Sequence, residues 1–511
     1  MKKYLIFSIL MLLAQAVCLR GEGALVLTLD EAIKIALNKS YTIKAYRENK
    51  LSMEHFFKYY QAQFSPMLDF SVNAPSWNEN VSGIQRVDGL PVYNSTGQMQ
   101  FGSNLKFTYT LPTGGNFALT SQFYRENLKT VLAMKNYETL SARQAYSSIS
   151  LSFDQPIFTK NKLKENLEEA KLSYEKASSQ FTRGQLDIIY DVTNGFYSLY
   201  KAIRELEIAG EKSGNSEEAY RIAKLKGEAG RIPEGDVLIA EIAAAQNRAA
   251  LSESQGKLEK TKDTFKQLIG LNLDQDIQIL TDLKYDTFLI DLDEAIQKAL
   301  KYRLEINEAE LDINLQHIDV DRARRIREIS GKVSAYYDIT GVSTLEDGST
   351  GALFRSSFRN FVDRPPNRGV TLTFSYPIFD WGRGAQKVQQ ETASLREKEL
   401  SLENLKTTIV RDMRDIVRSF EETKNRLNIQ EKNQELAQRS YEISRMRFEH
   451  GNITSQELGM EQERLATTQL SYLDAFITYQ LAVADLKRKT LWDFKNNKSY
   501  LVEENYFQSK E

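Results

Sequence analysis

Cysteine and histidine are scarce in this chain, and their scarcity excludes several kinds of site. Cys18 is the only cysteine among 511 residues, so no disulfide bond can form within one chain and no cysteine cluster can bind a metal. Cys18 could instead carry a lipid, although Val17 before it is larger than the small residues usual there. His55, His317 and His450 lack the spacing of metal ligands. We therefore expect no catalytic residue, no metal site and no cofactor.

The chain also lacks a charge bias and, beyond its N-terminus, any long hydrophobic run. Lys and Arg number 67 against 69 Asp and Glu, which argues against nucleic acid as a partner. The apolar residues 4–13 follow two lysines and precede Ala14-Gln15-Ala16, which predicts a secretory signal peptide over 1–16, with cleavage somewhere in 16–23. A short N-terminal membrane helix is the alternative, but this run is too short for a hydrocarbon core of about 30 Å.

What the sequence does contain is two copies of one unit. The segment LTLDEAIKIAL at 27–37 returns as IDLDEAIQKAL at 290–300. The phrase PIF at 156–158 returns at 377–379, and the two copies stay aligned from there to a pair of glycine-containing turns. Copy one has about forty additional residues, all of them before its PIF.

The prolines separate helical from non-helical segments. Eight of the nine lie inside or beside two windows, roughly 64–158 and 331–379. Because Pro disrupts helix interiors, and because the remaining segments are rich in strong helix formers, those segments are predicted to be helical. Apolar residues such as Ile409 and Ile416 recur at seven-residue spacing, which predicts packing against neighbouring helices. For this segment alone, an isolated coiled coil is an alternative.

The two windows alternate between apolar and polar residues. Val370, Leu372 and Phe374 alternate with Thr371 and Thr373, which predicts strands with one apolar and one polar face. A soluble β-sandwich also alternates, but in an exported chain such segments are typical of an outer-membrane barrel. We expect two strands per copy and four per chain. Since open strand edges are not tolerated in lipid, three chains would share twelve strands.

The additional residues of copy one include YTLPTGGNFALTSQF at 109–123, which predicts a hairpin that turns at Gly114 and Gly115. This hairpin, about 101–124, either adds strands to the barrel or forms an extracellular rim. We favour the rim, because strands added to one copy would break the two-copy symmetry. Segment 342–368 is predicted to be another extracellular loop.

These patterns divide the chain into segments. The predicted division is signal peptide 1–16; repeat one 24–268, with strands about 64–156 and a helical hairpin tip about 227–236; linker 269–289; repeat two 290–490, with strands about 331–377 and a tip about 449–458; and a C-terminal tail 491–511.

Taken in order, the two LDEAI starts, the two PIF phrases and the two turns in which an acid follows glycine by six residues resemble the TolC-like outer-membrane efflux family. The resemblance covers about residues 25–490. It implies a mixed α and β membrane protein, a trimeric channel-tunnel with a shared twelve-stranded outer-membrane barrel and a long helical barrel in the periplasm. It also implies a passive exit duct of a tripartite efflux or type I secretion system, not an enzyme. The implied partners are two further copies (a homotrimer), outer-membrane lipid, a periplasmic adaptor protein and an inner-membrane RND or ABC transporter.

The resemblance also implies a gate at the periplasmic turns. The acid after the second turn is Glu457, and Asp236 is its equivalent in copy one. Three such carboxylates around a threefold axis would concentrate cations and raise one another's pKa. Alternatively, both acids simply complement a helix dipole.

The sequence departs from the family pattern beside this gate. The family often has a second acid at the position of Met460, where this chain has Glu461 next to it. A Tyr and an Arg that commonly flank the turn are replaced by Phe448 and Ile453, so the closing links must differ, with Arg447 or Arg445 as candidates.

Two further sets of residues are expected to serve the assembly. The turns themselves should contact the adaptor, through Gly230, Arg231, Ile232, Gly451, Asn452 and Ile453. The corners that join strands to long helices should be built from Pro156, Phe158, Pro377, Phe379, Asp380 and Gly382, with Asp380 and Thr159 as helix caps.

Two other classes of exported protein fit the sequence less well. A periplasmic adaptor also has a long helical hairpin, but one rather than two. An exported coiled-coil structural protein without a pore would have no use for the strand windows.

Overall fold

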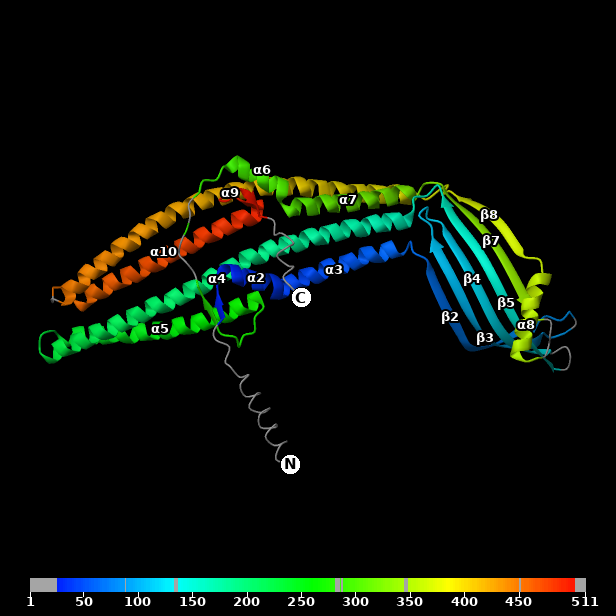
Figure 1. The fold of residues 1–511 in the computed structure, drawn as a ribbon, viewed down its shortest axis with the longest axis horizontal. Coiled ribbons are helices and arrows are strands. Elements are labelled where there is room, and N and C mark those ends of the chain that lie inside the picture. The colour runs from blue at the N-terminus through cyan, green and yellow to red at the C-terminus, as the bar shows by residue number, and fades with distance from the viewer. Residues whose placement is uncertain are drawn as a thin grey trace, which may run out of the picture. The chain divides into compact units, whose positions relative to one another are not determined.

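The computed structural model describes residues 25–87, 89–132, 137–280, 285, 288–343, 348–449 and 452–500. The predicted signal peptide at 1–16, Cys18, His450 and Gly451 lie outside these residues. The described chain forms two compact units (Figure 1). The helical unit contains the residues up to Leu51, Lys176–Glu310 and those from Leu400 on, and the sheet unit contains Ser52–Glu175 and Leu311–Glu399.

The helices of the two copies match in order and in length. The pairs are α2 (Leu29–Lys39) and α6 (Leu292–Tyr302) with 11 residues each, α3 (Tyr41–Ala62) and α7 (Leu304–Arg325) with 22, α4 (Lys162–Glu228) and α9 (Arg383–Glu449) with 67, and α5 (Glu234–Ile269) and α10 (Ser455–Thr490) with 36. The two predicted repeats are therefore confirmed. Within the described ranges, no helix is both long and apolar enough to span a membrane.

The helical unit is held by apolar side chains at the predicted seven-residue spacing. Ile409, Met413, Phe420 and Leu427 of α9 are all fully buried. Phe420 and Leu427 belong to the main core, which also contains residues of α2, α4, α5 and α10. Each fully buried side chain of this kind contributes about 1.5–3 kcal/mol. A short parallel pair, β1 (Leu25–Leu27) and β6 (Ile277–Ile279), adds to the core and was not predicted.

The two LDEAI segments begin helices through side-chain caps. The Thr28 side chain accepts a hydrogen bond from the Glu31 N–H, and the Glu31 carboxylate accepts one from the Thr28 N–H at 2.9 Å, which forms a capping box. In copy two, Asp291 caps α6 by accepting from the Glu294 N–H at 2.8 Å. The acid at the third position of α2 therefore has a structural reason, whereas in α6 it is Asp291, before the helix, that provides the cap.

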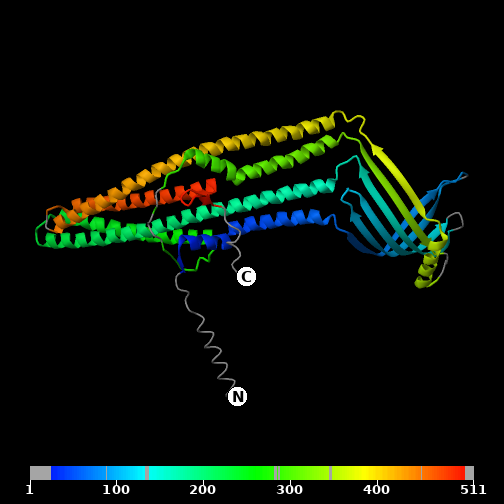
Figure 2. The ribbon, with the colours of Figure 1, turned by 45° about the horizontal axis from the view of Figure 1, so that its top comes forward.

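The sheet unit contains one antiparallel sheet in the order β2-β3-β4-β5-β7-β8 (Figure 2). The strands are β2 (Met67–Ile84), β3 (Val92–Thr110), β4 (Asn116–Leu132), β5 (Glu138–Ile157), β7 (Ser330–Val342) and β8 (Asn367–Ser375). The expectation of two strands per copy was wrong for copy one, which supplies four. The chain therefore contributes six strands to one sheet rather than four.

The additional hairpin is part of this sheet and not a rim. β3 and β4 pair with each other and with β2 and β5 along almost their full lengths. Their turn lies at the end of the sheet where β5 leads into α4, since the Gln155 side chain contacts Thr113 and the Asn161 side chain donates to the Pro112 carbonyl at 3.0 Å. We call this end of the sheet the helical end and the opposite end the loop end.

The sheet has one apolar and one polar face, as the alternation predicted. Leu119, Leu151 and Tyr337 lie opposite one another on adjacent strands, and their neighbours Thr120 and Ser150 lie on the other face. Large side chains of the apolar face remain exposed, among them Leu68, Phe70, Leu105, Leu119, Val370 and Leu372. An apolar surface of this extent requires a partner other than water.

A helix replaces the loop expected over 342–368. Helix α8 (Thr350–Asp363) packs on the apolar face, with Leu353 fully buried. Ser357 donates to the Gly341 carbonyl oxygen at 2.8 Å and lies 2.9 Å from Ser147 Oγ. A Cβ at Gly341 would lie 2.0 Å from the Ser357 carbonyl oxygen, so only glycine allows this approach.

Two glycines of α5 have opposite structural roles. Gly270 ends the helix with φ +76°, and a Cβ there would lie 2.4 Å from the Lys39 carbonyl oxygen. Gly256 lies inside the helix, and a Cβ there would meet nothing within 4 Å.

Gly270→Ala should destabilise the helical unit, since it combines left-handed strain with a backbone clash, by about 1–3 kcal/mol. The matched change Gly256→Ala should be neutral or stabilising by up to about 1 kcal/mol. Thermal unfolding followed by circular dichroism measures both. Equal midpoints for the two variants would refute this account of Gly270.

Candidate functional site

The tips of the two helical hairpins meet around one cavity. It has a volume of about 340 Å³, and its lining includes five of the predicted residues, namely Ile232, Asp236, Asn452, Ile453 and Glu457. Ile232 and Asp236 come from the turn between α4 and α5 and from the start of α5, and the other three come from the corresponding region of α9 and α10. The structure therefore places the two predicted gate acids on one cavity.

Glu457 belongs to a capping box at the start of α10. Its backbone N–H donates to Thr454 Oγ1 at 3.2 Å, and its Oε2 accepts from the Thr454 N–H at 2.8 Å. The hydrogen bond from the Thr454 backbone lowers the pKa of Glu457 most, and the Thr454 hydroxyl and the charge of Arg447 lower it further. Within one chain the Glu457 pKa is thus lowered, whereas the ring of carboxylates was expected to raise it.

Asp236 occupies the matching position in copy one without a capping box. The residue before α5 is Pro233, which offers no side-chain cap, and the Asp236 N–H donates to the Pro233 carbonyl oxygen at 3.0 Å. Proline also fixes the backbone at the start of this helix. The Asp236 side chain is exposed. The two acids therefore match in position but differ in how they are held.

Glu461 and Arg447 lie close by but do not line the cavity. Glu461 Oε2 accepts a hydrogen bond from Ser440 Oγ at 2.8 Å, and Oε1 lies 3.7 Å from Arg464. Glu461 therefore ties α10 to α9. Arg447 is exposed, and its carbonyl oxygen accepts from the Asn452 N–H at 2.8 Å, which helps to close the end of α9.

The first tip depends on a glycine in the left-handed region. Gly230 has φ +67°, and its N–H donates to the Gly227 carbonyl oxygen at 2.9 Å. The Arg231 N–H donates to the Lys226 carbonyl oxygen at 2.8 Å, and the Arg231 side chain is exposed. These contacts end α4 in the manner of a Schellman motif.

Contacts between the two hairpins were not predicted. Lys226 of α4 lies over the ring of Phe448 of α9, 5.0 Å from its centroid, and Phe448 is buried. Lys212 of α4 forms an ion pair with Glu463 of α10. Lys212, Phe448 and Glu463 line a second cavity of about 550 Å³. Sequence periodicity does not predict these contacts, because each of them joins residues that are far apart in the chain.

The corner of copy two is built around Asp380. Its Oδ1 accepts from the Gly382 N–H at 3.0 Å and its Oδ2 accepts from the Gly384 N–H at 2.9 Å. Donation by Gly384 is the main cause that lowers the Asp380 pKa, with further contributions from Gly382 and the nearby Arg327. Trp381 and Gly382 both have positive φ, +57° and +82°. β8 ends at Ser375, two residues before Pro377.

The corner of copy one uses different residues. β5 continues through Pro156 to Ile157, so this proline does not end the ladder, and Phe158 takes φ +61°. The expected cap Thr159 is not used. Asn161 caps α4 instead, with Oδ1 accepting from the Leu163 N–H at 2.9 Å.

Large aromatic side chains are exposed at both corners. Phe158 is 66% exposed, Phe379 71% and Trp381 88%. The rings of Phe379 and Trp381 pack edge to face, with centroids 4.6 Å apart. Aromatic residues in such numbers are typical of the edge of a membrane.

Within the described part of the chain, no group of His, Cys, Asp and Glu side chains could hold a metal ion. A sequence profile for the family described as "Outer membrane efflux protein" matches residues 118–271 and 295–490. No curated protein matches the sequence.

Several solved structures have a similar fold. The outer membrane channel CmeC of Campylobacter jejuni has a TM-score of 0.66 at 14% identity, over 90% of this chain and 85% of that one. VceC of Vibrio cholerae gives 0.62 at 15%, over 91% and 95%. The open state of the Neisseria gonorrhoeae channel MtrE gives 0.63 at 14%, over 92% and 90%.

The capping box predicts how Glu457 titrates. Thr454→Ala removes the hydroxyl and weakens the box, so the pKa of Glu457 should rise toward its ordinary value. Because the folded-state pKa is lowered, the box stabilises the fold above the unfolded-state pKa and loses this effect as the pH falls through the lowered pKa.

Carbon-13 NMR of labelled glutamate carboxyls, with Glu457→Gln to assign the signal, measures this pKa. Thr468→Ala, which changes a hydroxyl bonded within α10 to the Arg464 carbonyl oxygen, is the matched control. An unchanged Glu457 pKa in Thr454→Ala would contradict the assignment.

Proposed function

Because the chain belongs to the outer membrane efflux protein family, we propose that it is the exit duct of a tripartite efflux or type I secretion system. The chain lies in the outer membrane and extends into the periplasm. Its family consists of channel proteins and not enzymes. One observation supports the proposed duct most directly. Among the described strands, the sheet has an exposed apolar face, a polar face and two unpaired edges.

The unpaired edges favour closure between copies. β2 and β8 each have a neighbour on one side only. In lipid, the unsatisfied N–H and C=O groups of such an edge are too costly to leave open. We infer that β2 of one copy pairs with β8 of the next, and that three copies close the wall as a homotrimer.

A trimer of this chain would have eighteen strands, six from each copy. The diameter of a barrel grows roughly in proportion to its number of strands, so this barrel would be about half again as wide as one of twelve strands. Barrels of 16–18 strands leave an aqueous channel. The polar face would line that channel, and the apolar face would contact lipid.

The hairpin tips would form the periplasmic entrance. Glu457 and Asp236 share a cavity there, and three copies would place six carboxylates at the mouth, which favours cations. Lys226 with Phe448 and Lys212 with Glu463 join the two hairpins within each copy. We infer that these pairs rearrange when the entrance opens.

The same tips would dock a periplasmic adaptor, which in turn joins an inner-membrane RND or ABC transporter. Arg231 and Asn452 are exposed beside Ile232 and Ile453, so each tip offers polar and apolar contacts together. Loops at the end of rigid helices commonly carry binding. An adaptor or coiled-coil structural protein remains a poor alternative, because neither accounts for an exposed apolar sheet face.

The purified protein should form trimers that conduct ions in a planar lipid bilayer, with a preference for cations. Glu457→Gln should weaken that preference, since it removes three charges from the mouth. Glu259→Gln, which changes an exposed acid near the other end of α5, should affect it less. Single-channel recordings in a salt gradient measure the selectivity. A protein that stays monomeric and does not conduct would refute the proposal.

Deleting β3 and β4, residues 92–132, should leave β2 and β5 as a hairpin like β7 and β8. The resulting trimer would have twelve strands, so its barrel should be narrower by about one third. Electron cryo-microscopy of the wild-type and deleted proteins measures both diameters. A wild-type barrel with twelve strands would contradict the proposed barrel of eighteen strands, even if the deleted protein fails to fold.

A further inference from the structure

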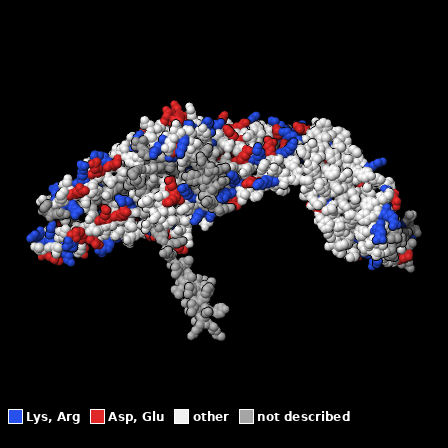
Figure 3. Space-filling model, viewed as in Figure 1, with Lys and Arg blue, Asp and Glu red and all other residues white. Residues whose placement is uncertain are grey.

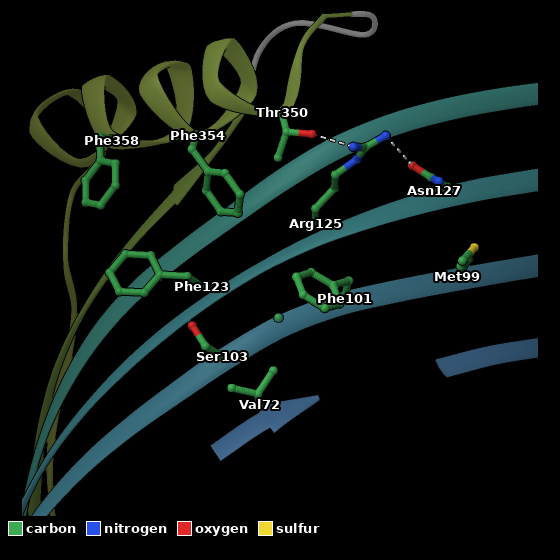
Figure 4. A pocket seen from close by; sticks show the side chains of 11 residues that line it. Val72, Met99, Phe101, Ser103, Phe123, Arg125, Asn127, Thr350, Phe354 and Phe358 are labelled. Carbon is green, nitrogen blue, oxygen red and sulfur yellow. Dashed lines mark hydrogen bonds between the residues drawn. The ribbon is translucent and has the colours of Figure 1, made fainter. Parts of the chain in front are cut away.

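Helix α8 and the sheet enclose a groove on the apolar face that no part of the proposed transport path uses. Its volume is about 820 Å³, within the range of ligand sites. Figure 4 shows Phe354 and Phe358 of α8 on one side and strands β2 to β4 on the other. The lining residues are Val72, Met99, Phe101, Gly102, Ser103, Phe123, Arg125, Asn127, Thr350, Phe354 and Phe358.

The groove is mostly apolar but has a guanidinium on its wall. Arg125 donates to Thr350 Oγ1 and, at 3.4 Å, to Asn127 Oδ1 (Figure 4). Both partners are neutral. Its Nε–H is buried and has no partner within the described residues. A charged side chain on an apolar face, with hydrogen-bonding capacity left over, indicates a missing anionic partner.

At Arg125 the side chains on the apolar face change from mostly apolar to polar and charged. On β4, Phe117, Leu119 and Phe123 precede it on this face, and Asn127 and Lys129 follow it. Opposite Asn127 on β5 lies Arg143. In Figure 3 most of the sheet unit is uncharged, and Lys and Arg side chains gather near the loops.

The position of this change fits a membrane boundary. About nine residues separate Asn116, at the helical end, from Arg125, which is about 30 Å along a strand. At a strand tilt of 35–45°, this length corresponds to about 23 Å along the barrel axis. That height is close to the apolar band of about 25 Å in outer-membrane barrels. Since the long helices extend into the periplasm, the loop end faces the cell exterior. Arg125 therefore lies at the level of the outer headgroups.

Helix α8 has the properties of a helix at a membrane surface. Leu353 and Ser357 face the sheet, and Arg355 and Arg359, four residues apart on one side, are exposed. Phe358 is 48% exposed and Val362 89%. The rings of Phe358 and Phe123 lie 5.4 Å apart, which fixes α8 against the strands. A helix with aromatic and cationic residues of this kind lies in the interface of a bilayer.

We propose that this groove binds a phosphate-bearing lipid of the outer leaflet. One acyl chain lies between α8 and strands β2 to β4, and the phosphate pairs with Arg125, with Arg143 on the same face of the adjacent strand. The charges are complementary, since Arg125, Lys129 and Arg143 lie on this part of the apolar face, where Glu79 is the neighbouring acid of β2. The inference depends on the sheet spanning the membrane as proposed above, with its apolar face toward lipid.

Native mass spectrometry of the intact assembly, titrated with diphosphoryl lipid A, tests the proposal. Arg125→Ala should weaken binding roughly fivefold to tenfold, as expected for one cation at a lipid phosphate. Ser103→Trp, which fills the groove, should weaken it as well. Lys106→Ala changes a cation on the polar face of β3, the strand that pairs with the strand of Arg125, and should leave binding unchanged.

Dephosphorylated lipid A should bind the wild type more weakly than the diphosphoryl form. Equal affinity for the two lipids, or equal affinity of Arg125→Ala and the wild type, would overturn the proposal. If Arg125→Ala fails to fold, a photoreactive benzoylphenylalanine in place of Phe358 keeps the test open, because it should capture lipid A. Capture of a neighbouring copy alone would overturn the proposal. Lipid binding can fail while conductance persists, which separates this inference from the proposed function.

Discussion

An open strand edge is not stable in a lipid bilayer, and most of this structure follows from that constraint. The six-stranded sheet has an apolar face that water cannot cover, so it must lie in the membrane. Its two edges, β2 and β8, then require partners that the described strands of one chain do not supply. In the proposed assembly, closing these edges between copies would also enclose the polar face as a channel.

The helical half could be predicted from the sequence because its signals are local. Proline positions and helix formers indicated the long helices, and the seven-residue spacing identified buried residues such as Ile409 and Phe420. The two LDEAI phrases coincide with the starts of α2 and α6, which the structure shows to be capped by Thr28 and Asp291. Equal lengths for all four helix pairs follow from the duplication that the repeated phrases showed.

The sheet was predicted less well because its organisation depends on distant contacts. Alternation revealed the strands β3 and β4, but an argument from symmetry placed their hairpin in a rim. The contacts of its turn with Gln155 and Asn161 place the turn at the helical end of the sheet instead, and no local sequence pattern predicts those contacts. Helix α8 was missed for the same reason, since its position depends on the space that Gly341 leaves for Ser357.

At the candidate site, the sequence located residues better than it assigned their roles. Glu457 and Asp236 do share a cavity, yet Glu457 is also half of a capping box that lowers its pKa. The corners show the same limit, because Asp380 and Asn161 cap equivalent helices by unrelated side chains. The two copies have helices of equal length, but the contacts that begin those helices differ.

Hydrogen exchange of the β2 backbone amides tests most directly whether the sheet closes between copies. Among the strands that the structure describes, β2 pairs only with β3, so about half of its amides lack a partner strand. In the purified assembly we expect the amides of β2 to be protected along the strand to the same degree as those of β4. Fast exchange at alternate β2 residues, beside a protected β4, would contradict the account.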